Sequence, residues 1–266
     1  MKINLKLNNN IINIKDENKI SKILLKSKYP YASISNKTID KILAINESIT
    51  LNLLLSLKNA IIKNNIIIQH HNLIKNEKEL SEEYYKNNIL LLSQKYKASP
   101  ITIIRVVYKY RGLSNKEILN LFKKNELMNE FDKKQFLLAL KYDIYGFVDE
   151  KQKLDESLSF EKKIEKILKL NNIDYETQET LTKQQQIEGH VFSTPDFLIK
   201  SELYINDKRV YWIDAKNFYG ANTTFIIKSI KKQTIKYINL YGDGCIIFNH
   251  GFSSKLMFNN IVLTNL

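Results

Sequence analysis

The chain has 266 residues, is 44% hydrophobic and carries a formal net charge of +13 at neutral pH. This length suits one large domain or two modest ones, and the apolar content excludes an intrinsically disordered chain. The excess of lysine and arginine favours a polyanionic partner, either nucleic acid or a membrane surface. Asn, Ile and Lys are used so heavily that an A+T-rich coding bias accounts for part of the charge, so charge alone does not establish nucleic-acid binding.

Cysteine usage and the lengths of apolar runs bear on the compartment. The single cysteine, Cys245, allows no intramolecular disulfide and no cysteine-based zinc site. The first fifteen residues lack the continuous apolar run of a signal peptide, and no apolar segment reaches transmembrane length. We therefore expect a soluble intracellular protein, nuclear and/or cytoplasmic and not secreted, that has no membrane partner.

The first 150 residues are expected to be helical. The Asn-rich segment 1–15 is weakly patterned and predicts a frayed start. Apolar residues at helical spacing predict helices over 16–29, 36–48 and 49–65. A polar stretch around residues 70–78 separates them from one long helix expected over 79–97.

Residues 99–124 have the outline of a helix-turn-helix. Ser99 followed by Pro100 is typical of a helix start, and residues 111–113, Arg-Gly-Leu, predict a tight turn. Ser114 and Glu117 have the spacing of a capping box, which predicts the start of a second helix. A helix, a short turn and a second helix form a unit that in some proteins reads DNA, although a plain helical bundle stays open as the alternative.

Asp132 is expected to cap a further helix over 133–143. The charged segment 149–153 then reads as a connector. The sequence thus predicts an all-helical, helix-turn-helix-like region over 1–150 that binds nucleic acid or a partner protein, followed by a second domain over 151–266.

The second half mixes helices and strands. The expected elements are a helix over 157–172, a strand over 175–183, a β-hairpin within 190–216, a helix over 223–241, a strand over 245–250 and a short final strand within 257–266. This order of helix, three strands, helix and strand predicts a mixed α/β fold.

The hairpin 190–216 carries the clearest candidate site. An Asn-Asp turn at 206–207 folds the second strand back along the first. Asp196 begins the first strand, and the second strand ends with Asp214 and Lys216, whose side chains share a face because strand residues alternate. We therefore expect two carboxylates and one amine to converge at one rim of the sheet.

These three groups are suited to metal-assisted hydrolysis of a phosphodiester. Two nearby carboxylates repel each other, and a hard cation such as Mg²⁺, which prefers oxygen ligands, removes that cost. A lysine beside them could orient or deprotonate a water, or stabilise a developing negative charge. A surface ion pair formed by chance stays open as the alternative, because these residue types are common.

Pro195-Asp196 followed by Asp214-Ala215-Lys216 resembles the pattern of the PD-(D/E)xK nuclease superfamily. The resemblance implies a restriction-endonuclease-like core with the order α-β-β-β-α-β and a mixed sheet.

The superfamily often places a glutamate on its first core helix, directed at the metal. That resemblance favours Glu161 over Glu165, which lies one turn further on. A glutamate favoured only by the dipole at the start of a helix is the alternative reading of Glu161.

The second core helix carries further candidates. Gln233 and Tyr237 share a helix face and resemble the Q-x-x-x-Y motif of a branch of these nucleases, which implies that they line the site and hold nucleic acid. Lys232 and Lys236 on the same helix could contact phosphates, although solvated lysines are the usual case.

Four segments are similar to the TPD-motif family, whose animal member is the codanin-interacting nuclease: GHVFSTPDFLI, YWIDAKNFYG, KKQTIKY and YGDGCIIFNHGF. The naming motif is Thr194-Pro195-Asp196, and Asp214 stands where some relatives have glutamate. The resemblance covers roughly residues 155–255 and is only architectural before them. It implies helix-turn-helix units ahead of a nuclease domain.

Carried onto this sequence, the resemblance implies that Asp196, Asp214 and Glu161 hold Mg²⁺ or Mn²⁺ and that Lys216 positions the attacking water. We therefore expect a divalent-metal-dependent nuclease that acts on DNA, with selectivity for structured DNA left open. A catalytically weak or inactive adaptor of the same fold and an RNA-directed nuclease are the alternatives. A codanin-like protein partner, which the resemblance implies only for animal relatives, and a homodimer also stay open.

Overall fold

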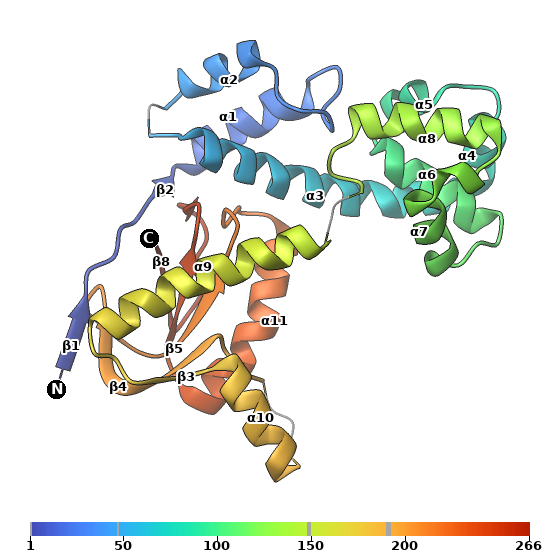
Figure 1. The fold of residues 1–266 in the computed structure, drawn as a ribbon. Helices are drawn as coiled ribbons and strands as arrows, with labels where there is room; N and C mark the ends of the chain where they lie inside the picture. Colours follow the sequence, from blue (N-terminus) through green and yellow to red (C-terminus); the bar gives the residue numbers. More distant parts are fainter. Residues whose placement is uncertain (1, 47, 148–149, 190–192) are drawn as a thin grey trace. The chain divides into compact units, whose positions relative to one another are not determined.

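The computed structural model describes residues 2–46, 48–147, 150–189 and 193–266. Contacts between Cα atoms divide the chain into two units. Unit 1 comprises residues 1–20, 45–60 and 149–266, and unit 2 comprises residues 21–44 and 61–148. The division falls within two helices, α1 (Ile14–Leu25) and α3 (Leu51–Lys75), so each helix contributes residues to both units (Figure 1).

Among the residues described, unit 1 contains a six-stranded mixed sheet. Its strands are β1 (Lys2–Leu5), β3 (Tyr175–Thr177), β4 (Phe197–Ile205), β5 (Lys208–Lys216), β6 (Gly244–Phe248) and β8 (Ile261–Asn265). The strand order is β1-β4-β5-β6-β8, and β3 also pairs with β4. Strands β3 and β5 run antiparallel to β4, whereas the pairs β1–β4, β5–β6 and β6–β8 are parallel.

The predicted hairpin is confirmed as β4 and β5. Asn206 and Asp207 both have positive φ angles, of 49° and 67°, which are the angles that a two-residue hairpin turn of type I′ requires. Asparagine and aspartate tolerate this conformation better than other non-glycine residues. The turn sets the pairing of Ile205 with Lys208 beside it, and a shift in register between Leu198 and Leu203 then brings Phe197 opposite Ile213 at the other end of the hairpin.

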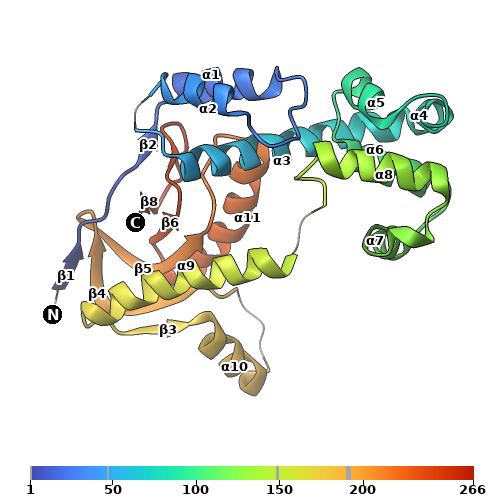
Figure 2. The same cartoon turned by 45° about the horizontal axis from the view of Figure 1, so that its top comes forward.

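Helices α9 (Glu150–Leu170) and α11 (Thr224–Tyr241) both contact β5 (Figure 2). Apolar residues of α9 pack in one cluster with Ile213, whereas Tyr237 of α11 packs its ring against Trp212. Neighbouring strand residues point to opposite faces, so the two helices cover opposite faces of β5. Gly244 of β6 allows Trp212 to lie close, because a Cβ atom there would be 1.9 Å from the indole ring.

The expectation of a frayed start over residues 1–15 is wrong. Strand β1 pairs with β4, and Ile3, Leu5 and Leu7 pack against the same core as Ile213. A second short strand, β2 (Ile11–Ile12), pairs with β7 (Phe252–Ser253). The region 1–150 is therefore not all helical, because apolar residues alternate over 3–7 and are half-buried in the sheet.

Unit 2 is helical throughout the residues described. Besides its parts of α1 and α3, its elements are α2 (Asn36–Leu43), α4 (Glu77–Tyr84), α5 (Ile89–Tyr96), α6 (Pro100–Tyr110), α7 (Asn115–Lys123), a 3-10 turn (Asn125–Leu127) and α8 (Glu130–Tyr142). The predicted caps of α6 and α7 are confirmed: Ser99 accepts from Thr102 N, and Ser114 forms a capping box with Glu117.

Two predicted elements of this unit are wrong in detail. The single helix expected over 79–97 is two helices, because the Asn88 side chain accepts from Leu90 N and Leu91 N and starts α5. The cap of α8 is Asn129 rather than Asp132, whose carboxylate instead pairs with Arg111 at 2.7 Å.

The predicted strand over 175–183 is also too long. Only β3 is extended, because the Thr177 side chain accepts from Thr180 N and starts α10 (Gln178–Glu188). Across the described residues, we find no helix with the length and apolar character needed to cross a membrane.

Candidate active site

The rim of the β4–β5 hairpin opposite its turn collects the predicted acids and lysine. Asp196 immediately precedes β4, and its Oδ2 accepts a hydrogen bond from Ala215 N at 2.6 Å. Because Phe197 pairs with Ile213, the start of β4 lies beside the end of β5, where Asp214 and Lys216 are found. The structure therefore brings Asp196, Asp214 and Lys216 together.

Asp214 and Lys216 form an enclosed ion pair between Oδ2 and Nζ. The Asp214 side chain is 1% exposed and that of Lys216 is 15% exposed. The amide of Gln233 on α11 links them: Lys216 Nζ donates to Gln233 Oε1 at 2.9 Å, and Gln233 Nε2 donates to Asp214 Oδ1 at 3.2 Å. The lysine ammonium is thus held in one place by two partners on different elements.

Tyr237 supports this amide from the next turn of α11. Its hydroxyl accepts from Gln233 Nε2 at 2.9 Å and donates to the Thr194 carbonyl at 2.8 Å. Tyr237 is only 4% exposed, so its hydroxyl is committed within the protein. The predicted pair on α11 therefore connects the carboxylate–lysine pair to the backbone just before Asp196.

Burial, together with repulsion between the carboxylates, disfavours the charged forms of the acids at this rim. Burial and the nearby Asp214 carboxylate raise the pKa of Asp196 to about 7, against the opposing effects of the Ala215 N–H and Lys216. Burial also raises the pKa of Asp214, although Lys216 opposes this. Asp214 Oδ2 contacts the lysine but accepts no well-directed hydrogen bond from any described residue.

Glu161 on α9 lies within electrostatic range of the same pair. It is half-buried, and burial followed by the Asp214 charge raises its pKa, whereas Lys216 lowers it. Glu165, one turn later, is engaged elsewhere: it accepts from Tyr175 OH at 2.9 Å and pairs with Lys169 at 2.8 Å. The structure thus distinguishes Glu161, which lies near the Asp214–Lys216 pair, from Glu165, which has other partners; the sequence had offered both for one role.

The donor set fits a hard cation that retains part of its hydration. In the part of the chain that the structure describes, no three His, Cys, Asp or Glu side chains converge closely enough to enclose a metal alone. Mg²⁺ is commonly bound through one or two carboxylates, with waters and substrate phosphates completing its shell. Asp196 and Asp214 supply two such groups, and a cation would share the Oδ2 of Asp214 with the Lys216 ammonium.

Comparison with known proteins assigns a family to this site. The family described as "Protein of unknown function TPD sequence-motif" matches residues 127–265, more than half of the chain. The chain belongs to the TPD sequence-motif family. The match contains every candidate site residue, from Glu161 to Tyr237, and the predicted membership of the TPD-motif family is confirmed.

One relative of this TPD-motif chain is the uncharacterized protein L539 of Acanthamoeba polyphaga mimivirus. The two are 29% identical over 152 residues, which is 55% of this chain and 53% of the viral protein. The chain therefore spans about half the length of that relative. No solved structure matches the chain.

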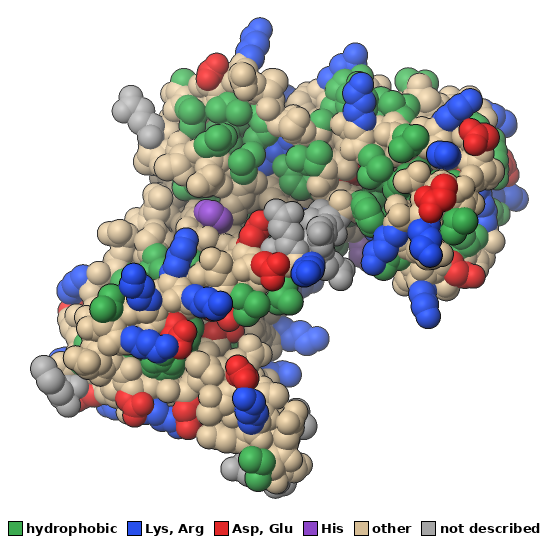
Figure 3. Space-filling model, viewed as in Figure 1, with side chains coloured by type: hydrophobic (Ala, Val, Ile, Leu, Met, Phe, Trp, Pro, Cys, Tyr) green, Lys and Arg blue, Asp and Glu red, His purple; other side chains and the backbone are tan. Residues whose placement is uncertain are grey.

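Two lysines of α11 were also predicted to contact nucleic acid at the TPD-motif site. Lys232 and Lys236 are exposed and form no ion pair with any residue described. Figure 3 shows lysine and arginine side chains spread over the face in view rather than gathered in one patch. The net charge therefore does not by itself mark a binding surface, and the two lysines stay a prediction.

The sequence did not single out Tyr241, which also contacts the TPD-motif segment. Its hydroxyl donates to the Ser193 carbonyl at 3.2 Å, one residue before the carbonyl that Tyr237 holds. The spacing of four residues from Tyr237 places both hydroxyls on one face of α11, and this spacing was visible in the sequence. Residues 190–192, which begin the predicted hairpin stretch, lie outside the described residues.

Proposed function

We propose that this TPD-motif chain is a divalent-metal-dependent nuclease that hydrolyses phosphodiester bonds of DNA. The observation that carries the proposal is the convergence of Asp196, Asp214 and Lys216 at one rim, where the Asp214 carboxylate is buried against the Lys216 ammonium. Structural ion pairs rarely place a second carboxylate beside the first, because the two repel each other. A site that binds a cation and a phosphate accounts for all three groups.

The order of elements supports a PD-(D/E)xK core. Helix α9, strands β3, β4 and β5, helix α11 and strand β6 follow the order helix, three strands, helix and strand, with α10 inserted between β3 and β4. The acids occur at the start of β4 and the end of β5, where the superfamily pattern places them. Helices α6 and α7 have the helix-turn-helix outline, for which DNA contact and simple helical packing both remain open.

In the proposed reaction, Asp196 and Asp214 hold Mg²⁺ or Mn²⁺, with Glu161 supporting the same shell. A bound divalent ion of this kind polarises the phosphate and lowers the pKa of a water at the site. Lys216, fixed by Gln233, points its ammonium at the same rim, where it orients the water or stabilises negative charge as it develops. Lys232 and Lys236 hold neighbouring phosphates of the strand.

The test is cleavage of labelled substrates in Mg²⁺ or Mn²⁺, with EDTA as a control. The panel contains single-stranded DNA, duplex, splayed arm, flap, four-way junction and single-stranded RNA. We expect metal-dependent cleavage of DNA that falls at least about 10²-fold in Asp214→Asn, because the variant lacks one of the two carboxylates that hold the cation and a bound cation contributes several kcal/mol to the reaction. Glu165→Gln, whose carboxylate is engaged with Tyr175 and Lys169, is the matched control and should retain cleavage.

A nucleic-acid-binding adaptor that does not cut is the second candidate. The observation that favours it is the ion pair of Lys216 with Asp214, because the ammonium contacts the oxygen that a cation would use. Equal binding by the parent chain and Asp214→Asn, with no product on any substrate, would establish the adaptor. Cleavage of the RNA strand alone would assign RNA as substrate. Nuclear residence, a codanin-like partner and a homodimer remain further proposals.

A further inference from the structure

Unit 2 contains a cavity of about 670 Å³ whose rim is rich in lysine. Its walls come from the end of α1, the loop that follows, and residues of α3 and α5. Four lysines line it: Lys22, Lys26, Lys28 and Lys97. This volume lies in the range of pockets that bind small ligands.

A neighbouring hollow of about 460 Å³ shares two of these lysines. Lys22 and Lys26 line both spaces, and α2 adds Lys37 and Lys41 to the second. Among the described residues that line the two spaces, none is acidic. We call these six residues the lysine cavity: Lys22, Lys26, Lys28, Lys37, Lys41 and Lys97.

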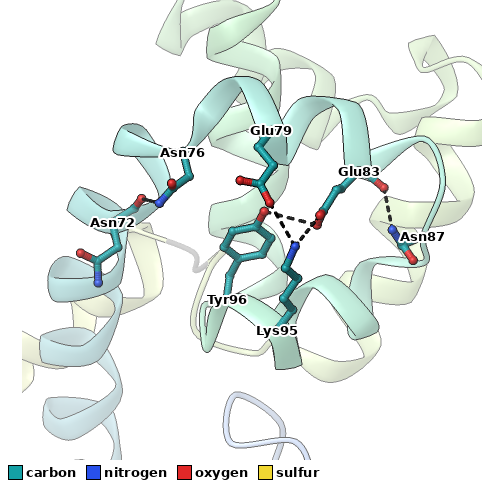
Figure 4. Close-up of polar contacts among 7 residues, drawn as sticks. All are labelled: Asn72, Asn76, Glu79, Glu83, Asn87, Lys95 and Tyr96. Atoms are coloured by element: carbon teal, nitrogen blue, oxygen red, sulfur yellow. Dashed lines mark hydrogen bonds and ion pairs between the residues drawn. The ribbon is translucent and has the colours of Figure 1, made fainter.

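No described acidic side chain pairs with the lysines of the lysine cavity, and the Lys28 ammonium lies 5.3 Å from the centroid of the Tyr29 ring. All six side chains belong to exposed residues, and none forms an ion pair with another described residue. Lys95 on the same helix end as Lys97 differs: it pairs with Glu79 at 3.2 Å and also with Glu83 (Figure 4). Clustered like charges repel, so an anion that entered the cavity would relieve a cost that Lys95 does not have.

Aromatic rings and amides form the inner wall of the cavity. The half-buried Tyr29 lies against Tyr142, with ring centroids 4.5 Å apart. The Tyr31 hydroxyl donates to the Lys97 carbonyl at 2.8 Å and accepts from Asn65 Nδ2 at 2.7 Å. These contacts hold the rings in place, and basic residues beside fixed aromatic rings are the combination found in sites for single-stranded nucleic acid.

We propose that the lysine cavity binds a single-stranded segment of nucleic acid, with its lysines on the phosphates and an unstacked base against Tyr29. A duplex is disfavoured because its bases are stacked inside and cannot reach the ring. The cavity shares no residue with the carboxylate rim of unit 1. Binding at this cavity therefore requires no metal and does not depend on the proposed cleavage reaction.

The experiment measures binding of a fluorescent oligothymidylate to the full chain in EDTA, over a series of salt concentrations. The test variant carries Lys22→Gln, Lys26→Gln, Lys28→Gln and Lys97→Gln. Each phosphate contact on a single strand contributes about 0.7 to the slope of log K against log salt. We expect the slope to fall by about 3 and the affinity at 0.1 M salt to fall at least tenfold.

The matched control carries four exchanges in the same unit outside the cavity: Lys78→Gln, Lys86→Gln, Lys116→Gln and Lys123→Gln. These residues are exposed and form no ion pair with a described residue, so the change in net charge is identical. The control should keep its slope. Equal losses in both variants, or a larger loss in the control, would overturn the proposal in favour of diffuse charge or of contacts through α7.

Two further arms define the ligand. Tyr29→Leu should weaken binding of the single strand about tenfold with an unchanged salt slope, because stacking is lost and no phosphate contact is. Equal dependence of duplex and single-strand binding on the four lysines would overturn the single-strand assignment. Binding only to vesicles of anionic lipid, lost in the lysine variant, would replace nucleic acid with a membrane surface.

Discussion

The carboxylate rim of unit 1 and the lysine cavity of unit 2 hold charge in opposite ways. At the rim, Asp214 is buried and Lys216 is fixed by two partners, so each charge occupies one position. In the cavity, lysines are exposed, and the described residues give them no acidic partner. Fixed charges in a buried site are suited to chemistry that requires exact geometry, whereas exposed charges without ion-pair partners are suited to binding a flexible polyanion.

Loss of the fixed lysine should produce the largest effect. Lys216→Met retains most of the side-chain volume but removes the ammonium held by Asp214 and Gln233, so we expect cleavage to fall at least about 10³-fold, which is about 4 kcal/mol in the barrier. Single-turnover cleavage rates measure it. Lys200→Met, which removes a lysine of the same hairpin from a surface pair with Glu176, is the control. Similar losses in both variants would mean that Lys216 has only a structural role.

A divalent cation should stabilise unit 1 in a manner that depends on the rim. Binding to the folded state alone adds about 2.7 kcal/mol of stability at a ligand concentration 100 times the Kd. Thermal unfolding with and without Mg²⁺ should therefore show a rise in Tm that disappears in Asp196→Asn and persists in Glu165→Gln. An equal rise in Tm in the parent and both variants would mean that the cation binds outside the carboxylate rim. The contrast between a metal-binding rim and a metal-independent lysine cavity would then be wrong.

A third buried carboxylate of unit 1 should make stability depend on pH. Glu17 is 5% exposed and accepts hydrogen bonds from Tyr219 OH at 3.2 Å and Asn222 N at 3.0 Å, and burial raises its pKa above the ordinary 4.5. Because the folded state then binds the proton more tightly than the unfolded chain, the stabilising effect of protonation is complete below about pH 4.5 and is lost as pH rises through the raised pKa.

Glu17→Gln should remove the contribution of Glu17 to this dependence, while Asp196 and Asp214 keep theirs, so Tm should decrease less between pH 4 and pH 7 than in the parent. The amide keeps an oxygen for Asn222 N, and its NH₂ group can donate to the Tyr219 hydroxyl oxygen in place of the bond that the carboxylate accepted. Glu77→Gln, on the first turn of α4, gives the background pH dependence of an acid in unit 2. Parallel profiles for the parent and Glu17→Gln would contradict the prediction.

The smallest expected effect is the change in stability when lysines of the lysine cavity are substituted. Exposed side chains without ion pairs usually contribute within about 0.5 kcal/mol each, and relief of their repulsion acts in the opposite direction. The variant with Lys22, Lys26, Lys28 and Lys97 exchanged for glutamine should thus unfold at the same temperature as the parent or slightly above it. A clear decrease in Tm would show that these lysines support the fold.

The hairpin could be predicted because its determinants are local. Asn206 and Asp207 favour the required turn, and the period of two along each strand places Asp214 and Lys216 on one face. Strand β1 carries the same alternation at Ile3, Leu5 and Leu7, but its partner lies about 200 residues away and an Asn-rich context hides it. Turns and strands that depend on neighbouring residues can be predicted from one sequence, whereas the pairing of strands that are distant in the sequence cannot.

The choice between Glu161 and Glu165 shows the same limit. Both lie on α9 one turn apart, and only the positions of Tyr175 and Lys169 reveal that Glu165 is engaged. The lysine cavity could not be predicted from the sequence either, because Lys97 lies near the lysines of residues 22–41 only in the folded chain. The apolar pattern over 79–97 is continuous, so it predicted one helix and gave no sign that Asn88 starts a second one.

The pairing of β1 with β4 has a consequence for biosynthesis. The ribosome releases residues 2–5 long before residues 202–205, so β1 must wait for most of the chain before its hydrogen bonds can form. Unit 2 is complete once residue 148 has emerged, and its helices depend mainly on contacts close in sequence, which form quickly. The nascent chain would therefore carry a folded helical insert while the first strand of the sheet is still unpaired, and in that interval its apolar alternation is open to capture by chaperones.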